Sequence, residues 1–111
     1  MPYSAKPIHA ASAVLFRTLG HPARVRILEL LRDGELSVGS LQDALGLDSG
    51  GTSQHLAALR RIGLVESRRE GTSVYYRASD PQVFELLEVG RKLIARTLTE
   101  QQSLLAELES E

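Results

Sequence analysis

The chain has 111 residues, of which 42% are apolar and 24% are charged, a composition typical of one globular domain with a modest core. It contains no cysteine, which excludes a disulfide framework and thiolate chemistry, and its apolar runs are too short to cross a bilayer. No signal segment opens the chain, so we expect a cytoplasmic protein with no membrane partner.

The formal net charge of −1 conceals an uneven distribution of charge along the chain. Residues 53–77 hold five arginines and two glutamates, a local net charge of +3, whereas residues 98–111 hold four glutamates and no basic residue. Phosphate binding depends on local potential. The acidic end therefore does not argue against nucleic-acid binding by the middle of the chain.

The first part of the chain predicts two helices after a flexible N-terminus at residues 1–7, which contains two prolines. Residues 8–19 have helical apolar spacing, and this helix is either a core-packing element or also a subunit contact. Pro22 favours the start of a second helix, which is predicted to run to about Arg32. A single domain is expected over residues 8–111.

The central stretch is a helix-turn-helix candidate. A first helix is expected at residues 38–45, with Ser37 as its cap. Gly46 is expected to end this helix, because glycine adopts the left-handed conformation at little cost. Asp48 and Ser49 supply side-chain oxygens that can cap a second helix over residues 49–62.

The second helix of this pair combines an apolar stripe with a polar face. Leu56, Leu59 and Ile62 share the apolar side. A buried stripe behind short polar donors and arginines is what a helix that contacts base edges requires. The polar face is predicted to present Thr52, Ser53, Gln54, His55, Arg60 and Arg61.

Two features of this helix have two interpretations each. Gly50 and Gly51 disfavour a helix by up to about 1 kcal/mol each relative to alanine. The first turn is therefore either frayed or merely permissive, or it is closely approached by a phosphate. His55 either contacts a phosphate or packs beneath the helix as a hydrogen-bonded core histidine, which the start of the buried stripe at Leu56 favours.

Residues 65–77 alternate as a β-hairpin does, with Glu70 and Gly71 predicted in the turn. A basic hairpin beside a reading helix could clamp phosphates or the minor groove, although charged tips are often merely solvated. The tip residues are Arg68, Arg69, Thr72 and Ser73. Non-specific phosphate affinity is expected from Arg60, Arg61, Arg68 and Arg69.

A last helix is predicted over residues 81–109, with Asp80 as its cap. At ~1.5 Å per residue it would be about 43 Å long, which exceeds what one small domain can cover. We therefore infer a homodimer whose dimerisation helices lie at 8–19 and 81–109. The predicted interface residues are Val14, Leu15, Leu87, Gly90, Ile94, Leu98 and Leu105.

Three motifs resemble, in order, those of the ArsR (ArsR/SmtB) family of bacterial repressors: FRTLGHPARVRIL at 16–28, SQHLAALRRIGLV at 53–65 and REGTSVYY at 69–76. The resemblance implies a mainly α winged helix-turn-helix fold with about five helices, a small β-hairpin wing and a homodimer. It implies a repressor that reads a palindromic operator in double-stranded DNA. Helix 49–62 would lie in the major groove, and wing 65–77 on the flanking backbone or minor groove. By the family pattern the DNA-facing residues are Ser49, Gly50, Thr52, Ser53, Gln54 and His55, together with a wing that includes Tyr75.

The same resemblance indicates which family ligands are not expected. Metal-sensing members have a cysteine pair where this chain has Ser37 and Gly39. Zinc-binding members use positions in the last helices that here read Gln82, Leu93 and Arg96. No metal site and no cofactor are therefore expected. The protein has either a non-metal effector, whose identity is unknown, or no effector.

An enzyme is not expected, because no spacing of nucleophile, base and orienting residue is recognisable. Two non-enzymatic functions besides repression stay open. One is that of a protein-interaction module with a winged fold, and the second is that of a DNA-binding activator or nucleoid-type protein. The sequence does not decide the sign of regulation, the operator or the regulated genes.

Overall fold

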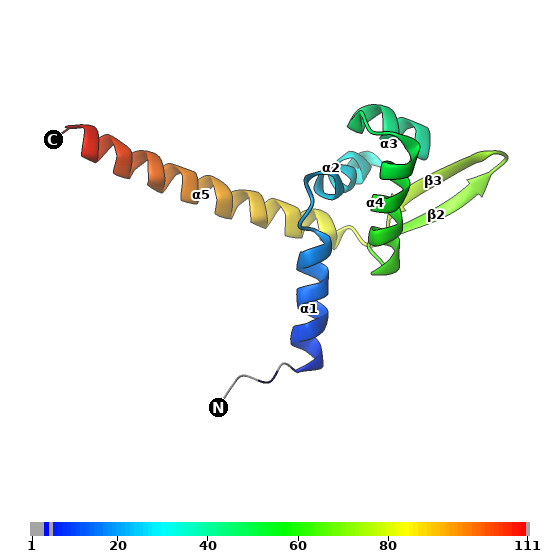
Figure 1. Ribbon diagram of the computed structural model, residues 1–111, viewed down its shortest axis with the longest axis horizontal. Helices are drawn as coiled ribbons and strands as arrows, with labels where there is room; N and C mark the ends of the chain where they lie inside the picture. The colour runs from blue at the N-terminus through cyan, green and yellow to red at the C-terminus, as the bar shows by residue number, and fades with distance from the viewer. Residues whose placement is uncertain (1–3, 5, 111) are drawn as a thin grey trace. The chain divides into compact units, whose positions relative to one another are not determined.

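The computed structural model describes Ser4 and residues 6–110 and comprises two compact units, Met1–Pro81 and Gln82–Glu111. Most of the predicted flexible N-terminus lies outside the described residues, but Pro7 already begins the first helix. The elements of the first unit are α1 (Pro7–Thr18), α2 (Pro22–Leu30), the 3-10 helix η1 (Leu31–Asp33), β1 (Leu36–Ser37), α3 (Val38–Leu45), α4 (Ser49–Arg61), β2 (Val65–Glu70) and β3 (Ser73–Ala78) (Figure 1). The second unit is the single helix α5 (Gln82–Ser110).

The predicted helices are present with small shifts at their ends. The first helix ends one residue earlier than predicted, at Thr18, and the last is Gln82–Ser110 instead of 81–109. The second α-helix ends at Leu30, and a 3-10 turn carries the chain to Asp33. Helix α3 has the predicted bounds.

The hairpin differs from the prediction at its turn. Glu70 belongs to β2 and pairs with Ser73, so the two connecting residues are Gly71 and Thr72. Gly71 has a φ of 62°, a conformation that tight hairpin turns require and that glycine adopts readily. The prediction that Glu70 lies in the turn was wrong by one position.

The sheet has three antiparallel strands in the order β1-β3-β2. The sequence pattern predicted only the hairpin and not β1, whose two residues pair with β3 as Leu36↔Tyr76 and Ser37↔Tyr75. A strand of two residues is too short to show alternation, and its pairing is decided by residues far along the chain. Its consequence is that the middle strand of the wing lies beside the start of α3.

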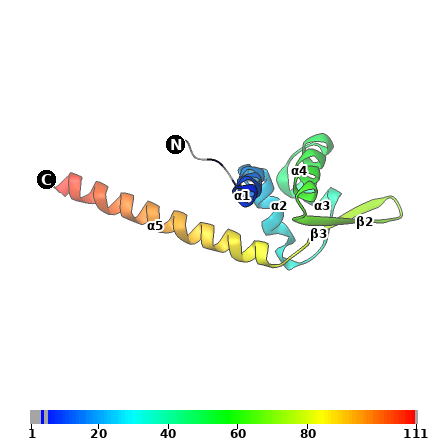
Figure 2. The same ribbon diagram turned by 90° about the horizontal axis from the view of Figure 1, so that it is seen from below.

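The core of the first unit lies where α2, α3, α4 and the base of the hairpin meet. The apolar side chains with at most 2% exposure there are Ile27, Leu28, Leu31, Leu41, Leu56, Leu59 and Val65. Helix α4 contacts β2, and both views show the hairpin extending from beside α4 with its tip clear of the helices (Figures 1 and 2). This packing fixes α4 and the wing as neighbours.

Helix α1 buries none of its own residues. Val14 is 37% exposed and Leu15 half-buried, which leaves both interpretations of this helix open.

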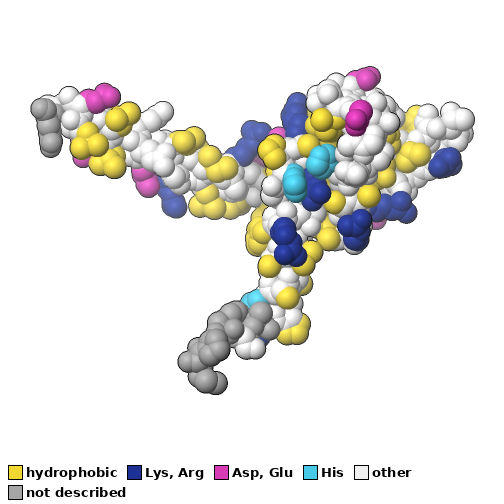
Figure 3. Space-filling model, viewed as in Figure 1, with side chains coloured by type: hydrophobic (Ala, Val, Ile, Leu, Met, Phe, Trp, Pro, Cys, Tyr) yellow, Lys and Arg dark blue, Asp and Glu magenta, His cyan; other side chains and the backbone are white. Residues whose placement is uncertain are grey.

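Helix α5 has 29 residues, and hydrophobic side chains recur along it (Figure 3). Of the predicted interface residues, Ile94, Leu98 and Leu105 are 53–61% exposed, whereas Leu87 and Gly90 are half-exposed. No helix among the described residues has the length and apolar character to span a membrane.

Candidate nucleic-acid interface

The helix-turn-helix is held at its ends by the predicted caps. The Ser37 hydroxyl accepts a hydrogen bond from the Ser40 backbone N–H at 3.1 Å at the start of α3. Gly46, with a φ of 66°, ends α3, and its N–H donates to the Gln42 carbonyl at 3.0 Å. These contacts satisfy groups that helix ends leave unpaired.

The glycine pair at the start of α4 is ordered. Gly50 and Gly51 are both helical, and the Asp48 carboxylate accepts from the Gly51 N–H at 2.7 Å. A Cβ at position 51 would lie 3.1 Å from the same carboxylate oxygen, so glycine there lets the cap sit close to the helix. The first turn of α4 is therefore helical and capped, and phosphate approach stays a prediction.

The exposed face of α4 contains most of the residues expected to face DNA. These residues are exposed, in contrast to the buried Leu56 and Leu59 of the same helix. The exposed members are Ser49, Gly50, Ser53, Gln54, Arg60 and Arg61.

Thr52 does not belong to this exposed face. Its side chain is fully buried, and its hydroxyl donates to the Asp48 carbonyl at 2.9 Å. Thr52 precedes Leu56 by four residues and Leu59 by seven, so helical spacing alone places it on the buried stripe. The prediction that its side chain contacts DNA is therefore corrected.

His55 is half-buried beside α2 rather than fully exposed. Its Nδ1 accepts a hydrogen bond from Arg24 Nε at 3.1 Å, and Arg24 Nη1 donates to the Thr18 carbonyl at 3.1 Å. The His21 ring lies 5.8 Å from the His55 ring, and Figure 3 shows two histidine side chains together on this face. This arrangement supports the packed, hydrogen-bonded interpretation of His55. Its partner Arg24 was not among the predicted site residues.

The surroundings of His55 predict a pH dependence of stability. Partial burial, and then the positive charges of Arg24 and His21, lower the pKa of His55 below its ordinary value of about 6.5. As the pH falls through that ordinary value toward the lowered one, the unfolded chain binds more protons than the folded chain. The contribution of His55 to the free energy of unfolding is therefore complete above about pH 6.5 and decreases below it.

Urea unfolding at about pH 7.5 and about pH 5.5 should show a smaller loss of stability in His55→Asn than in the wild type. Asparagine keeps an acceptor near the position of Nδ1 but does not titrate. An unchanged pH dependence in His55→Asn would contradict the assignment.

The pleat of the hairpin separates the wing residues onto two faces. Residues opposite one another in an antiparallel pair share a face. Arg68 and its cross-strand partner Tyr75 lie on one face, and Arg69 and Val74 lie on the other.

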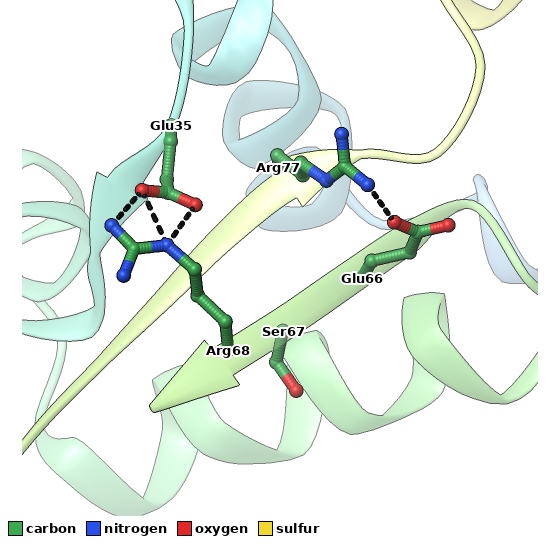
Figure 4. A pocket seen from close by; sticks show the side chains of 5 residues that line it. All are labelled: Glu35, Glu66, Ser67, Arg68 and Arg77. Atoms are coloured by element: carbon green, nitrogen blue, oxygen red, sulfur yellow. Dashed lines mark hydrogen bonds and ion pairs between the residues drawn. The ribbon is translucent and has the colours of Figure 1, made fainter. Parts of the chain in front are cut away.

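On the first face, Arg68 donates hydrogen bonds to two carboxylates. Its Nε donates to the Glu35 carboxylate at 2.8 and 3.0 Å (Figure 4). Its Nη1 donates to Glu70 at 2.9 Å. Its guanidinium carbon lies 4.6 Å from the centroid of the Tyr75 ring. The hydrogen bonds from Arg68 lower the pKa of Glu35 and raise the pKa of Arg68 itself.

A second ion pair, Arg77–Glu66 at 2.6 Å, continues the same face (Figure 4). A cavity of about 350 Å³ is lined there by Glu35, Glu66, Ser67, Arg68 and Arg77. Glu35 was not among the predicted site residues. It lies 33 residues from Arg68, so no local pattern connects the two.

Three residues expected to face DNA line a different hollow, of about 460 Å³, between the hairpin and the two helices of the motif. Ser53 lines it from α4, and Thr72 and Ser73 line it from the hairpin. The start of α3 completes the hollow with Ser37, Val38 and Gly39. The fold therefore brings together hydroxyl groups that are about 20 residues apart in the sequence.

Basic side chains lie on the hairpin as well as on other elements of the chain (Figure 3). In the described part of the chain, no three His, Asp or Glu side chains are grouped as potential metal ligands.

Two helices joined by a tight turn and followed by an antiparallel hairpin define a winged helix-turn-helix protein. Residues 21–67 match the family model described as bacterial regulatory protein, arsR family. Together with the similarity to HTH-type transcriptional regulators, this match shows that the chain belongs to the ArsR family of transcriptional regulators.

The relatives include proteins of known structure. The chain is 44% identical over 104 residues to the uncharacterised HTH-type transcriptional regulator Rv0081 of Mycobacterium tuberculosis. This match covers 93% of this chain and 91% of Rv0081. The Rv0081 crystal structure matches with a TM-score of 0.81 and 45% identity over 87% of this chain and 98% of that one.

Two further relatives bear on regulation and assembly. The transcriptional activator HlyU of Vibrio cholerae is 42% identical over 84 residues, 76% of this chain and 78% of HlyU. The homodimeric winged helix-turn-helix domain of Mb0332 from Mycobacterium bovis, a possible ArsR-family regulator, matches with a TM-score of 0.72 and 32% identity. That match covers 86% of this chain and 91% of the other.

Proposed function

We propose that this chain is a homodimeric, sequence-specific repressor that binds a palindromic operator. Helix α4 lies in the major groove, and the hairpin contacts the flanking backbone or minor groove. The observation that carries the proposal is the exposed polar face of α4, which adjoins the hydroxyl-lined hollow shared with the hairpin.

The exposed side chains of α4 suit direct contact with bases. Gln54 can bond bidentately to adenine, and the Ser53 hydroxyl can bond a base edge or a phosphate. Arg60 and Arg61, at the end of the same helix, can neutralise phosphates. In a dimer, a two-fold axis would place two such helices in successive major grooves, about 34 Å apart.

The apolar residues of α5 support the homodimer. Val89, Leu93, Leu104 and Leu108 are more than half exposed, as are Ile94, Leu98 and Leu105. A soluble monomer rarely leaves so long an apolar surface uncovered. The relative Mb0332 is a homodimer, which also favours a second copy of this chain as the partner.

We also propose that DNA binding is independent of metal ions. The chain has no cysteine, and neither Ser37 nor Gly39 can replace a soft ligand. Zinc or a chelator should therefore leave operator affinity unchanged. A reporter gene placed behind the operator distinguishes repression from activation, which is the role named for HlyU. The protein should silence this reporter gene.

Fluorescence anisotropy on the DNA upstream of the protein's own gene tests the proposal. A preference of roughly a thousandfold or more over scrambled DNA is expected, as for specific binders. Gln54→Ala should lower operator affinity by about tenfold or more, because each bidentate base contact contributes ~1–3 kcal/mol. Its binding to scrambled DNA should be nearly unchanged.

Gln102→Ala, an exposed glutamine on α5, is the matched control and should bind operator as the wild type does. Equal losses on operator and scrambled DNA in Gln54→Ala would remove Gln54 from base contact. A folded dimer that binds neither DNA would instead favour a protein-interaction module.

A further inference from the structure

We propose that the two adjacent arginines of the wing have different roles, an inference that rests on the proposed DNA-binding function. Arg68 fastens the hairpin to the segment before α3 through Glu35 and Tyr75, whereas Arg69 is the phosphate contact of the wing. Arg68 and Glu35 are thus positioning residues.

The donors of Arg68 are already engaged by protein groups. One edge of the guanidinium, Nε and Nη2, donates to Glu35, and Nη1 on another edge donates to Glu70. The Tyr75 ring covers one flat side. A DNA phosphate approaching this group would meet two carboxylates, and like charges repel at such distances.

The position of Glu35 explains how its contact with Arg68 holds the hairpin against the segment before α3. Glu35 directly precedes β1, whose Ser37 pairs with Tyr75 in β3, and Tyr75 in turn pairs with Arg68 in β2. The Arg68 side chain therefore spans the middle strand and links the two outer strands of the sheet. Because Ser37 also caps α3, the contact connects the hairpin to the start of the helix-turn-helix.

Arg69 lies on the opposite face, with Val74 as its cross-strand partner. Val74 lines the hydroxyl-rich hollow that also contains Ser53 of the proposed reading helix. The described structure shows no ion pair or hydrogen bond made by the Arg69 side chain. Its charge is thus available on the side of the wing that faces α4.

The balance of charge favours the same side. The Arg68 face holds three carboxylates, from Glu35, Glu66 and Glu70, against the guanidinium groups of Arg68 and Arg77. The Arg69 face has no carboxylate among the strand residues of the hairpin. Phosphate is attracted to local positive potential, so the wing should contact DNA with the Arg69 face.

The salt dependence of DNA binding separates the two arginines, because each phosphate neutralised contributes ~0.9 to the slope of log affinity against log salt. We would measure anisotropy on operator and scrambled DNA over a series of salt concentrations for wild type, Arg68→Gln and Arg69→Gln. Arg69→Gln should lower the slope by about 0.9 per protomer on both DNAs. Arg68→Gln, the matched neighbour on the same strand, should leave the slope unchanged.

The fastening role is tested by a double-mutant cycle with Glu35→Gln. Each of Glu35→Gln and Arg68→Gln should weaken operator binding by roughly two- to fivefold, the range of a well-formed surface pair. The double variant should be no weaker than Arg68→Gln alone, because Arg68→Gln already removes the contact with Glu35. Tighter binding and a steeper slope in Glu35→Gln would mean that Glu35 competes with phosphate, and would overturn the proposal.

Two other results also decide against the proposal. A fall in slope for Arg68→Gln equal to that for Arg69→Gln would make Arg68 a phosphate contact. An unchanged slope for Arg69→Gln would remove Arg69 from that role.

A measurement without DNA distinguishes failure of this inference from failure of the proposed function. A ¹³C NMR titration of the Glu35 carboxyl group in the full chain should give a higher pKa in Arg68→Gln than in Arg69→Gln, because Arg68 holds Glu35 ionised. If the wild type binds no DNA yet this difference is found, the contact between Arg68 and Glu35 is supported and the proposed DNA-binding function is wrong. If the wild type binds operator and the difference is absent, the role of the Arg68–Glu35 contact is contradicted and the DNA-binding function is not.

Discussion

Leu59→Ala is expected to destabilise the folded protein by about 2–5 kcal/mol. Leu59 lies on the buried side of α4 and has no exposed surface. Truncation to alanine removes apolar contacts and leaves a cavity where α4 meets the other helices. The total stability of a small domain is only ~5–15 kcal/mol, so this single change removes a large share of it.

Urea unfolding followed by far-ultraviolet circular dichroism, at one fixed protein concentration, measures the change. Leu47→Ala is the matched control, because Leu47 lies in the turn before α4 and is 37% exposed. It should cost well under half of the Leu59→Ala loss. Similar losses in the two variants would show that α4 is not anchored through Leu59.

Ile94→Arg is expected to convert the proposed dimer into a monomer and to lower operator affinity by about a hundredfold or more. Ile94 is 61% exposed in the single chain and lies in the apolar stripe of α5. In a dimer contact a buried, unpaired guanidinium would have to lose its hydration. A monomer also loses the gain of ~10²–10⁴ in affinity that two linked reading heads provide.

Analytical ultracentrifugation gives the assembly state, and anisotropy on operator gives the affinity. Ser103→Arg is the matched control, because it adds the same charge to the same helix. Position 103 is nine residues beyond 94, which at ~3.6 residues per turn places it on about the opposite side of α5. A monomeric wild type, or an Ile94→Arg variant that stays dimeric, would contradict the proposed interface.

The sequence was sufficient to predict the features that depend on neighbouring residues. The cap at Ser37 and the helix end at Gly46 were predicted correctly. Of the two candidate caps for α4, Asp48 and Ser49, the structure uses Asp48. Each depends on hydrogen bonds or a backbone conformation within three or four residues. The periods of the apolar residues also placed α3, α4 and the hairpin to within two residues.

Thr52 shows where the prediction of DNA-contacting residues from the sequence was wrong. Its burial could have been predicted from its spacing relative to Leu56 and Leu59, but its hydroxyl suggested a DNA contact. A threonine inside a helix can satisfy its hydroxyl with the carbonyl four residues earlier, as Thr52 does with Asp48. Spacing was therefore the better guide than residue type.

The sequence by itself determined the order and type of the elements and the existence of a polar face on α4. These features depend on the spacing of apolar residues and on hydrogen bonds between residues close together in the sequence. The tertiary structure alone decided which side chains meet. Arg24 and His55 are 31 residues apart, and Glu35 and Arg68 are 33 apart. Their contacts depend on how the helices and strands pack, which no short stretch of the sequence specifies. The alternation of the hairpin already placed Arg68 and Arg69 on opposite faces of the wing. Only the pairing of three strands brought Arg68 beside Glu35, a contact that gives the two arginines different surroundings.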